Sequence, residues 1–403
     1  MSAARRIAFV CPRFAEDGAL GGAETLLRSL AVRAARAGRE VTFLTTCARD
    51  HFTWKNDLPP GERLIAGLRV RFFPVDGNRD LDAFRRVQDR ISCRAEVSRD
   101  DELLWQKNNV NSTALYEHLR AEGETYDRIV MGPYLFGLVY FASRIHPSRT
   151  ILLPCLHDES FAYLQTVREL FQGAAGWIFN SEPERDLAMR LYNLDPLRSR
   201  VVGLGLEPFP SNPLRFRSKY GLDSPFVLYA GRREPLKGTP LLLDYLAAFR
   251  ERTRRDLKLV LTGSGPIEPP PSLAPHIRDL GFVSEEDKHD AMAAAESFCH
   301  PSTNESLSIV ILESWLAGTP VLVHAGGDVM PYHCRKSNGG LWFRNYPEFE
   351  EALTMLCSHP ELKRQMGASG KAYVQRVYGW EGVERELLKA LDQPLQVPPP
   401  VGR

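Results

Sequence analysis

The chain has 403 residues, of which 43% are apolar and 25% charged, and its formal net charge is +1 at pH 7. This length exceeds the roughly 250 to 300 residues at which one hydrophobic core stops growing, so two domains are expected. The near-zero net charge argues against a nucleic-acid binder, which would carry a large excess of Lys and Arg.

The N-terminal apolar run, Ile7 to Cys11, is shorter than the roughly 7 to 15 residues of a signal-peptide core and is better interpreted as a buried strand. No later stretch approaches the roughly 18 apolar residues of a membrane span. The seven cysteines are scattered without a CxxC pair, as expected for reduced thiols. These features predict a cytoplasmic protein, with peripheral contact at the inner membrane face as an open alternative.

In the first half, strand-like apolar runs alternate with helical patterns, which predicts a parallel, doubly wound sheet. The expected elements are strands at 7–11, 40–45, 128–131, 150–153 and 177–180, and a helix at 23–37 closed by Gly38.

A second series of the same kind follows the loop at 206–212. Its expected elements are strands at 226–230, 257–262, 298–300 and 320–324, a helix at 240–254, and a helix that begins near 306–308 and ends at Gly318. The fold class is therefore α/β with two domains, at 1–205 and 206–378. The tail at 394–403 is proline-rich and expected to be disordered.

The segment 76–101 departs from this rhythm because Phe84, Val87, Ile91 and Ala95 recur at helical spacing among arginines. A solvated helix lying on the first domain explains the pattern. An acceptor-binding or membrane-surface element is the alternative. The same segment contains Asp80-Leu81-Asp82, a DxD spacing, but away from any strand end, so no metal site is assigned.

The most informative stretch surrounds Glu305 and Glu313. The backbone N–H groups and positive dipole of the helix expected near Ser306 to Ser308 can bind a diphosphate. Counted as helical positions, the eight residues from Glu305 to Glu313 leave both carboxylates within about one quadrant, where they can accept from sugar hydroxyls. A helix cap and a solvated position are the plain alternatives.

A second cationic element follows the strand that ends before Gly231. Arg232 and Lys237 lie in one short loop there, and ligands of open α/β sheets bind beyond the carboxyl ends of strands. Two cations at that edge can neutralise the charge of a departing nucleotide diphosphate. Ordinary surface solvation is the alternative.

Taken together, these motifs resemble those of glycosyltransferase family 4. Glu305 to Glu313 is similar to the family's E-x7-E signature and Arg232 with Lys237 to its R-x4-K pair, while 204–207 and 261–266 fall where the family has glycine-containing loops. The resemblance implies the GT-B fold, in which two Rossmann-like, doubly wound parallel-sheet domains face each other across a cleft. It also implies a nucleotide-sugar donor, retention of anomeric configuration and no metal or other cofactor.

The resemblance further assigns roles to single residues. Glu305 contacts the donor sugar, Glu313 holds the ribose, and Arg232 with Lys237 grips the diphosphate. The remaining expected donor contacts in the second domain are Gly263, Ser306, Leu307, Ser308 and Ile309. The family usually has glycines where this chain has Ser306 and Ser308, which makes close backbone approach to phosphate less assured.

The loop 17–25 of the first domain contains Gly18, Gly21 and Gly22 and can approach a phosphate or sugar closely. It is not the GxGxxG fingerprint, which weakens the hypothesis of a nicotinamide enzyme. A plain strand-to-helix turn is the alternative. Gly21-Gly22-Ala23-Glu24 resembles the family's GGAE loop, which places Gly22 near the donor phosphate.

His157 follows the strand that ends at Leu153, and such a histidine is more often a structural hydrogen-bonder than a catalyst. The resemblance places a His-Asp pair here facing the donor sugar, so His157 joins Glu305, Arg232 and Lys237 as an expected catalytic residue. Segment 180–182 is a weaker candidate for the acceptor side. The last helix, about 379–393, resembles one that crosses back onto the first domain.

These features predict a retaining glycosyltransferase in glycan, polysaccharide or glycoconjugate biosynthesis. The expected partners are a nucleotide-sugar donor and a carbohydrate, lipid-linked or protein acceptor. A nucleotide-sugar epimerase or hydrolase on the same fold, or a catalytically silent sugar-nucleotide-binding scaffold, are the alternatives.

Overall fold

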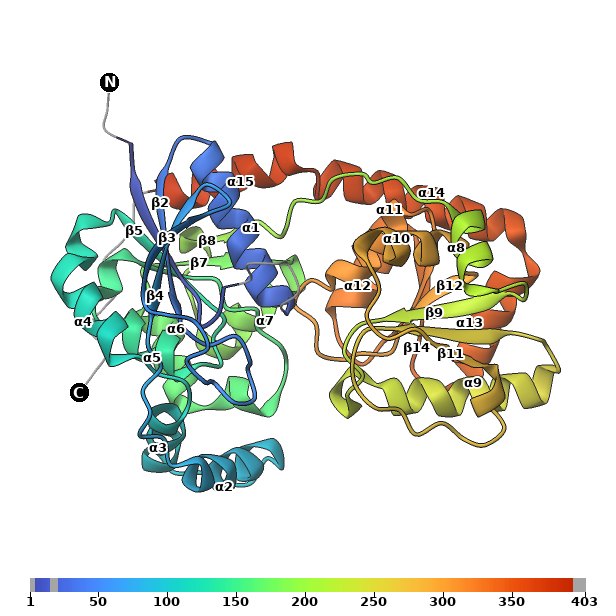
Figure 1. The fold of residues 1–403 in the computed structure, drawn as a ribbon, viewed down its shortest axis with the longest axis horizontal. Coiled ribbons are helices and arrows are strands. Elements are labelled where there is room, and N and C mark those ends of the chain that lie inside the picture. The colour runs from blue at the N-terminus through green and yellow to red at the C-terminus, as the bar shows by residue number, and fades with distance from the viewer. Residues whose placement is uncertain (1–3, 15–20, 394–403) are drawn as a thin grey trace. The chain divides into compact units, whose positions relative to one another are not determined.

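The computed structural model describes residues 4–14 and 21–393. They form two compact units, residues 4–14 and 21–204 with 383–393, and residues 205–382 (Figure 1). The tail at 394–403, for which disorder was expected, lies outside the described residues.

The first unit is built on an eight-stranded sheet in which only β3 runs antiparallel to its neighbour. In sheet order the strands are β3 (Gly61–Ile65), β4 (Leu68–Phe73), β2 (Glu40–Thr46), β1 (Arg6–Val10), β5 (Arg128–Met131), β6 (Thr150–Leu152), β7 (Gly176–Phe179) and β8 (Ser199–Val201). Its helices are α1 (Gly22–Arg36), α2 (Leu81–Ser92), α3 (Arg99–Asn108), α4 (Thr113–Glu122), α5 (Gly137–Ser143), α6 (Gln165–Gly173) and α7 (Glu182–Tyr192).

The second unit is built on a six-stranded, all-parallel sheet. In sheet order the strands are β11 (Ile277–Asp279), β10 (Lys258–Thr262), β9 (Phe226–Ala230), β12 (Ser297–His300), β13 (Val321–His324) and β14 (Gly340–Phe343). Its helices are α8 (Pro213–Tyr220), α9 (Thr239–Thr253), α10 (Glu285–Ala294), α11 (Ile309–Leu316), α12 (Val329–Ser337), α13 (Tyr346–Ser358) and α14 (Pro360–Val377).

Short 3-10 turns complete both units. They are η1 (Gly123–Thr125), η2 (Pro147–Arg149), η3 (Ser160–Tyr163), η4 (Pro196–Arg198), η5 (Pro235–Lys237) and η6 (Ala274–His276). The last helix, α15 (Trp380–Asp392), begins in the second unit and continues in the first. Its first-unit part is held by ion pairs, among them Glu384 with Arg33 and Asp392 with Arg39.

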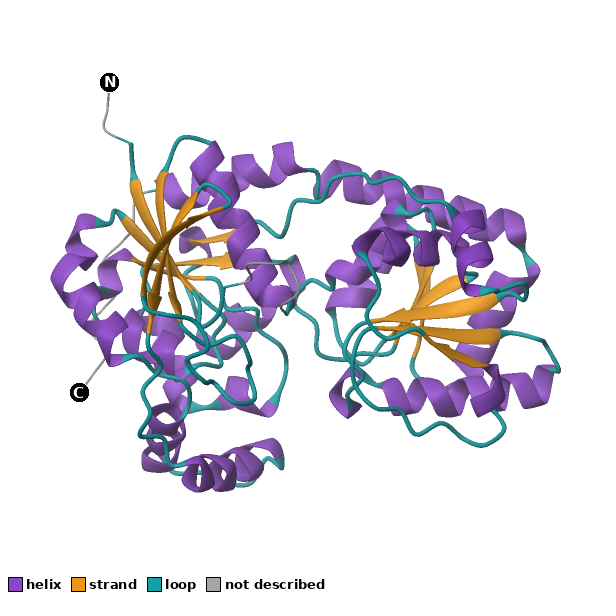
Figure 2. Cartoon of the chain, in the orientation of Figure 1, coloured by secondary structure: helices purple, strands orange, loops and turns teal. Residues whose placement is uncertain are grey.

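Continuous apolar runs become central strands because both faces of each parallel sheet are covered by helices, as Figure 2 shows. All five residues of β9 are buried, and β5 and β9 have the bounds expected from the sequence. The functional loops therefore leave rigid, buried strands. None of the helices within the described ranges is long and apolar enough to cross a membrane.

The helix expected in the arginine-rich segment 76–101 is present as α2, but it ends at Ser92. Arg94 adopts a left-handed conformation, so Ala95 is outside the helix and exposed. Val87 and Ile91 pack into the core of the first unit, as expected for a helix lying on that domain. Asp80 caps α2 by accepting from the Ala83 N–H at 2.9 Å.

Candidate active site

The loops at the carboxyl edge of the second sheet approach one another closely around Gly263, which follows β10. Gly263 has φ +106°, and a Cβ there would lie 2.2 Å from the carbonyl oxygen of Gly231, which follows β9. The same two loops also share a backbone hydrogen bond, in which the Arg233 N–H donates to the Ser264 carbonyl at 2.7 Å. The expected donor loop around Gly263 is therefore packed backbone against backbone with the loop that carries Arg232.

A similar approach joins the loop before α9 to the loop after β12. Gly238 is left-handed, with φ +72°, and a Cβ there would lie 2.5 Å from the Pro301 carbonyl oxygen. This packing brings Lys237 next to Glu305, although 68 positions separate them: Lys237 Nζ donates to Glu305 Oε1 at 2.8 Å. The two motifs that the sequence suggested separately thus meet in one cluster.

Glu305 also contacts His300, the last residue of β12, whose Nε2 lies 3.0 Å from the same Oε1. Burial by itself would raise the pKa of Glu305, but Lys237 and His300 outweigh it and hold that pKa well below its ordinary value. Glu305 is therefore ionised at neutral pH, with His300 Nε2 carrying the proton that it donates. Sequence reasoning missed His300, whose only signal was its place at a strand end.

The two adjacent arginines of this edge differ in exposure. The Arg232 side chain is 47% exposed and pairs with Glu234 at 3.2 Å. Arg233 is buried, donates to the Gly263 carbonyl at 2.8 Å and pairs with Asp279. Arg233 thus braces the loops, whereas Arg232 is accessible to an anionic ligand.

The helix expected from Ser306 to Ser308 begins later, at Ile309. Because the four residues from Glu305 are not helical, the argument that counted eight helical positions to Glu313 was wrong. The chain enters α11 through Ser308, a left-handed residue with φ +62°. In the first turn of α11 the Ile311 N–H donates to the Ser308 carbonyl at 3.2 Å, so the N–H groups of Ile309 and Val310 are the ones that this helix start offers to an anion.

Leu307, like Ser306 and Ser308, is buried in this approach to α11. Among the described residues Ser308 Oγ has no hydrogen-bond partner, and Ser308 does not cap the helix through its side chain. The usual glycine of the family pattern would satisfy the left-handed backbone without burying a hydroxyl.

Replacing Ser308 by glycine is expected to raise the free energy of unfolding of the second unit by about 1 kcal/mol, because it relieves a left-handed non-glycine residue. Chemical denaturation followed by fluorescence measures this change. Ser308→Ala keeps the Cβ and the strain and is the matched control, for which a smaller gain is expected. An equal gain in both variants would contradict the backbone explanation.

Glu313 lies in the middle of α11 and is bound by Lys288 of α10, which donates to Glu313 Oε1 at 3.1 Å. Lys288 also pairs with Glu285 at 2.8 Å. Glu285, His289 and Glu313 have ligand atoms within 4.8 Å of one another, as metal ligands do. Since the Lys288 ammonium binds both carboxylates, we assign Lys288 as their counter-charge.

In the first unit, Gly21 is the N-cap of α1, which begins at Gly22. A Cβ at Gly21 would lie 2.8 Å from Glu24 Oε2, and Glu24 forms a buried ion pair with Arg13. Close packing thus favours glycine at the start of α1. Gly18 lies outside the described residues.

His157 follows β6 and lies in a network that sequence reasoning missed. Its Nδ1 is 3.5 Å from Glu159 Oε1, and the buried Tyr134 donates its hydroxyl to the same oxygen at 2.7 Å. A carboxylate fixed in this way favours the tautomer with a proton on Nδ1 and leaves Nε2 as the acceptor. Asp158 instead pairs with Arg190 at the surface.

The weaker hypothesis that 180–182 lines the acceptor side stays a prediction. Asn180 and Ser181 are buried, and the Ser181 side chain caps α7 by accepting from the Glu184 N–H. The Ser181 hydroxyl thus has a structural role at the start of α7.

The sequence-based hypothesis that His157 is catalytic predicts that Tyr134→Phe lowers kcat about fivefold, the effect of losing one hydrogen bond of about 1 kcal/mol that orients Glu159 beside His157. Donor KM should stay unchanged. Steady-state kinetics test this, with Tyr163→Phe as the control, because Tyr163 is exposed and its hydroxyl donates to Asp158 at 2.7 Å. The same loss in both variants would contradict the assignment.

Residues 211–373 match the family model described as Glycosyl transferases group 1. The second unit therefore carries a glycosyltransferase group 1 domain. All the candidate residues of that unit, from Arg232 to Glu313, lie within the match.

Two bacterial relatives are both named D-inositol 3-phosphate glycosyltransferase. The one from Frankia alni is 31% identical over 246 residues, which cover 55% of this chain and 60% of that protein. The one from Saccharomonospora viridis is 26% identical over 409 residues, which cover 91% of this chain and 88% of the relative. The matches above 30% identity thus span 50–60% of the relatives' length.

Among solved structures, Anabaena HepE in complex with UDP-glucose superposes with a TM-score of 0.68 at 19% identity, covering 96% of this chain and 99% of HepE. At this identity the likeness concerns the fold. It confirms the prediction of a GT-B protein with two parallel-sheet domains.

Proposed function

We propose that the protein is a retaining glycosyltransferase of family 4 that transfers a sugar from a nucleotide-diphosphate donor to an acceptor hydroxyl. The observation that carries this proposal is the contact of Glu305 with Lys237 at the carboxyl edge of a group 1 domain. An ionised, largely buried carboxylate beside a lysine offers an acceptor for sugar hydroxyls and a cation for phosphate in one place.

The donor is assigned to the loops of the second unit. Lys237 has three N–H donors and uses one on Glu305, so it can also bind a phosphate oxygen. Arg232 adds a planar guanidinium, and the start of α11 adds backbone N–H groups. We propose UDP-glucose as the first donor to test, because the HepE structure contains it.

In the proposed reaction the bond between the anomeric carbon and the β-phosphate oxygen breaks, and a bond to the acceptor oxygen forms on the same face of the sugar. The acceptor proton passes to an oxygen of the leaving phosphate. Arg232 and Lys237 neutralise the charge that develops on the leaving group, so the proposal needs no metal or other cofactor. His157 is proposed as a further catalytic residue, as the family resemblance implies.

For the acceptor, we propose D-inositol 3-phosphate as the first candidate, because the relatives' names state it. Carbohydrate, lipid-linked and protein acceptors follow in the same assay. The site of action is proposed to be the cytoplasm, with peripheral contact at a membrane for a lipid-linked acceptor.

The test is a mass-spectrometric screen of the purified chain with UDP-, GDP- and ADP-sugars without added metal, with and without the acceptor. Transfer to the acceptor with retained configuration, lost in Glu305→Ala and Arg232→Ala, is the expected result. Glu361→Ala is the matched control, since Glu361 is exposed and its carboxylate contacts Arg364 and Gln365 of the same helix.

The alternatives give different products in the same screen. Free sugar without acceptor product would indicate a hydrolase, and an isomerised nucleotide sugar would indicate an epimerase. A chain that binds none of the donors would contradict the proposal and favour the scaffold hypothesis.

A further inference from the structure

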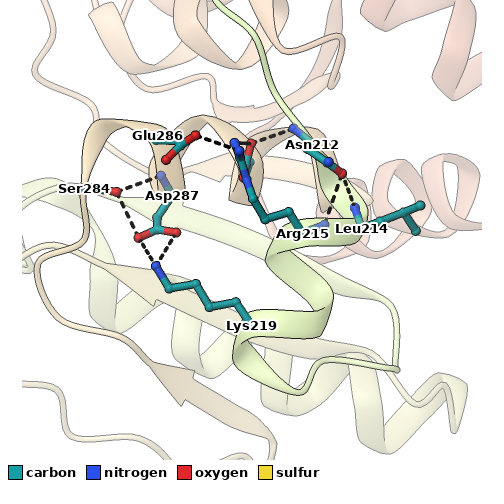
Figure 3. A network of polar contacts seen from close by, with 8 residues as sticks. Asn212, Leu214, Arg215, Lys219, Ser284, Glu286 and Asp287 are labelled. Carbon is teal, nitrogen blue, oxygen red and sulfur yellow. Dashed lines mark hydrogen bonds and ion pairs between the residues drawn. The ribbon is translucent and has the colours of Figure 1, made fainter.

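Helix α10 is fixed to α8 by a network of polar contacts (Figure 3). Asp290, fully buried, accepts from Arg215 Nε at 2.5 Å and from the Asn212 N–H at 2.6 Å. Lys219 of α8 donates to both oxygens of Asp287, at 2.8 and 2.7 Å. Asp287 and Asp290 lie about one helical turn apart, so their contacts with Lys219 and Arg215 hold this part of α10 against α8.

One residue on from Asp287, Lys288 points to a different side of the helix, since each step turns an α-helix by about 100°. Its side chain is 18% exposed and lies between Glu285 and Glu313, with Nζ at 2.8 and 3.1 Å from them. Burial would lower the pKa of Lys288, but the two carboxylates raise it above its ordinary value. Lys288 is therefore a charged, largely buried lysine beside Glu313.

The two oxygens of Glu313 differ. Oε1 accepts from Lys288, whereas Oε2 is buried and has no hydrogen-bond partner among the described residues. A buried carboxylate oxygen without a partner is costly, so it points to a missing donor. The ribose of a nucleotide supplies such a donor as one of two vicinal hydroxyls.

We propose that Lys288 is a positioning residue for donor binding: it holds Oε1 of Glu313 and thereby presents Oε2, as part of a carboxylate, to the ribose hydroxyls of the nucleotide. The assignment rests on the proposed function, because the ribose belongs to the nucleotide-sugar donor. Lys288 itself contacts Glu313 rather than the ligand.

The electrostatics of Glu313 lead to a pH-dependent test. Burial raises its pKa, Lys288 lowers it, and Glu285 of the same helix raises it further. His289, also on α10, has its pKa lowered to about 4 by burial and by Lys288, so it is neutral in the assay range. The remaining charged group that acts on Glu313 is Lys288, so its removal should raise the pKa of Glu313 further.

A carboxyl whose pKa is raised keeps its proton to higher pH, so at the low end of the assay range the ionised fraction of Glu313 should be smaller without Lys288 than with it, and this difference should shrink as the pH rises. Lys288→Met should therefore bind a nucleoside diphosphate about tenfold more weakly than wild type at pH 6 and recover towards wild-type affinity at pH 9.

Calorimetric titration with UDP and GDP between pH 6 and 9 measures this, with their 2′,3′-dideoxy forms as probes of the ribose contact. Wild type should prefer the diol forms, and Lys288→Met should lose this preference at low pH. Lys219→Met is the matched control, because it removes a lysine that contacts α10 at Asp287 instead of Glu313. Its affinity for the nucleotides should follow that of wild type.

The Glu313→Gln side chain cannot ionise, so this variant should bind the nucleoside diphosphates weakly at every pH. The double variant Glu313→Gln/Lys288→Met should bind them no more weakly than Glu313→Gln alone. Lys288→Arg, which keeps the charge, should restore most of the affinity, and thermal unfolding checks that each variant is folded. A pH-independent loss in Lys288→Met, or none, would overturn the assignment while leaving the proposed function intact. A wild type that binds neither nucleotide would overturn both.

Discussion

Glu305→Gln is expected to lower kcat/KM for sugar transfer by about 10²- to 10³-fold, the usual effect of removing one preorganised electrostatic group from a catalytic site. The amide keeps the size of the side chain but loses the charge that Lys237 and His300 stabilise. Lys237 would keep an amide oxygen as a possible acceptor but lose the negative charge that it contacts at 2.8 Å. Steady-state kinetics with the donor from the screen measure the effect.

Two further variants make this result specific. Lys237→Met should have a loss of similar size, and the double variant should lose much less than the product of both, because the two residues act as a unit. Glu361→Gln removes an exposed carboxylate and should leave kcat/KM unchanged. Independent, multiplicative losses would contradict the idea that the contact between Glu305 and Lys237 organises the site.

Gly263→Ala is expected to destabilise the second unit by about 3 kcal/mol and to abolish donor binding. Part of the cost is a left-handed backbone in a residue with a Cβ, about 1–2 kcal/mol. The rest is the clash with the Gly231 carbonyl, since the new Cβ would lie 2.2 Å from that oxygen and the loops would have to move apart. Denaturant unfolding and calorimetry with UDP measure the two effects.

Gly221→Ala separates the two causes. Gly221 also has a left-handed backbone, with φ +62°, but a Cβ there would meet no atom within 4 Å. It should therefore cost only the conformational part, about 1–2 kcal/mol, and leave nucleotide binding unchanged. Equal destabilisation in both variants would show that the close approach of the two loops is unimportant.

Several elements could be predicted from the sequence because local burial patterns define them. β9 is a run of five buried residues followed by Gly231, and its bounds were predicted to the residue. The edge hairpin β3–β4 was missed because alternating arginines conceal its apolar positions and neither strand is fully buried. The start of α11 was misplaced because nothing in a single sequence indicates that Ser308 is left-handed.

The candidate site divides in the same way. The sequence identified Glu305, Lys237, Arg232 and Glu313 by their place after strands or in a helix that follows a strand. It did not identify Lys288, His300 or Glu159, since nothing in their local patterns marks a lysine, histidine or glutamate as a partner of a buried group. Those residues act through contacts across 25, 5 and 25 positions, to Glu313, Glu305 and Tyr134.

The sequence by itself determined two successive α/β units with long apolar strands and polar loops at the carboxyl ends, because burial on both faces of a sheet leaves an uninterrupted local pattern. Only the tertiary structure decided which charges meet. Ion pairs and hydrogen bonds need separations near 3 Å between segments distant in the chain, and those depend on strand order, left-handed residues and helix packing. The contacts of Lys237 with Glu305 and of Lys288 with Glu313 arise in this way.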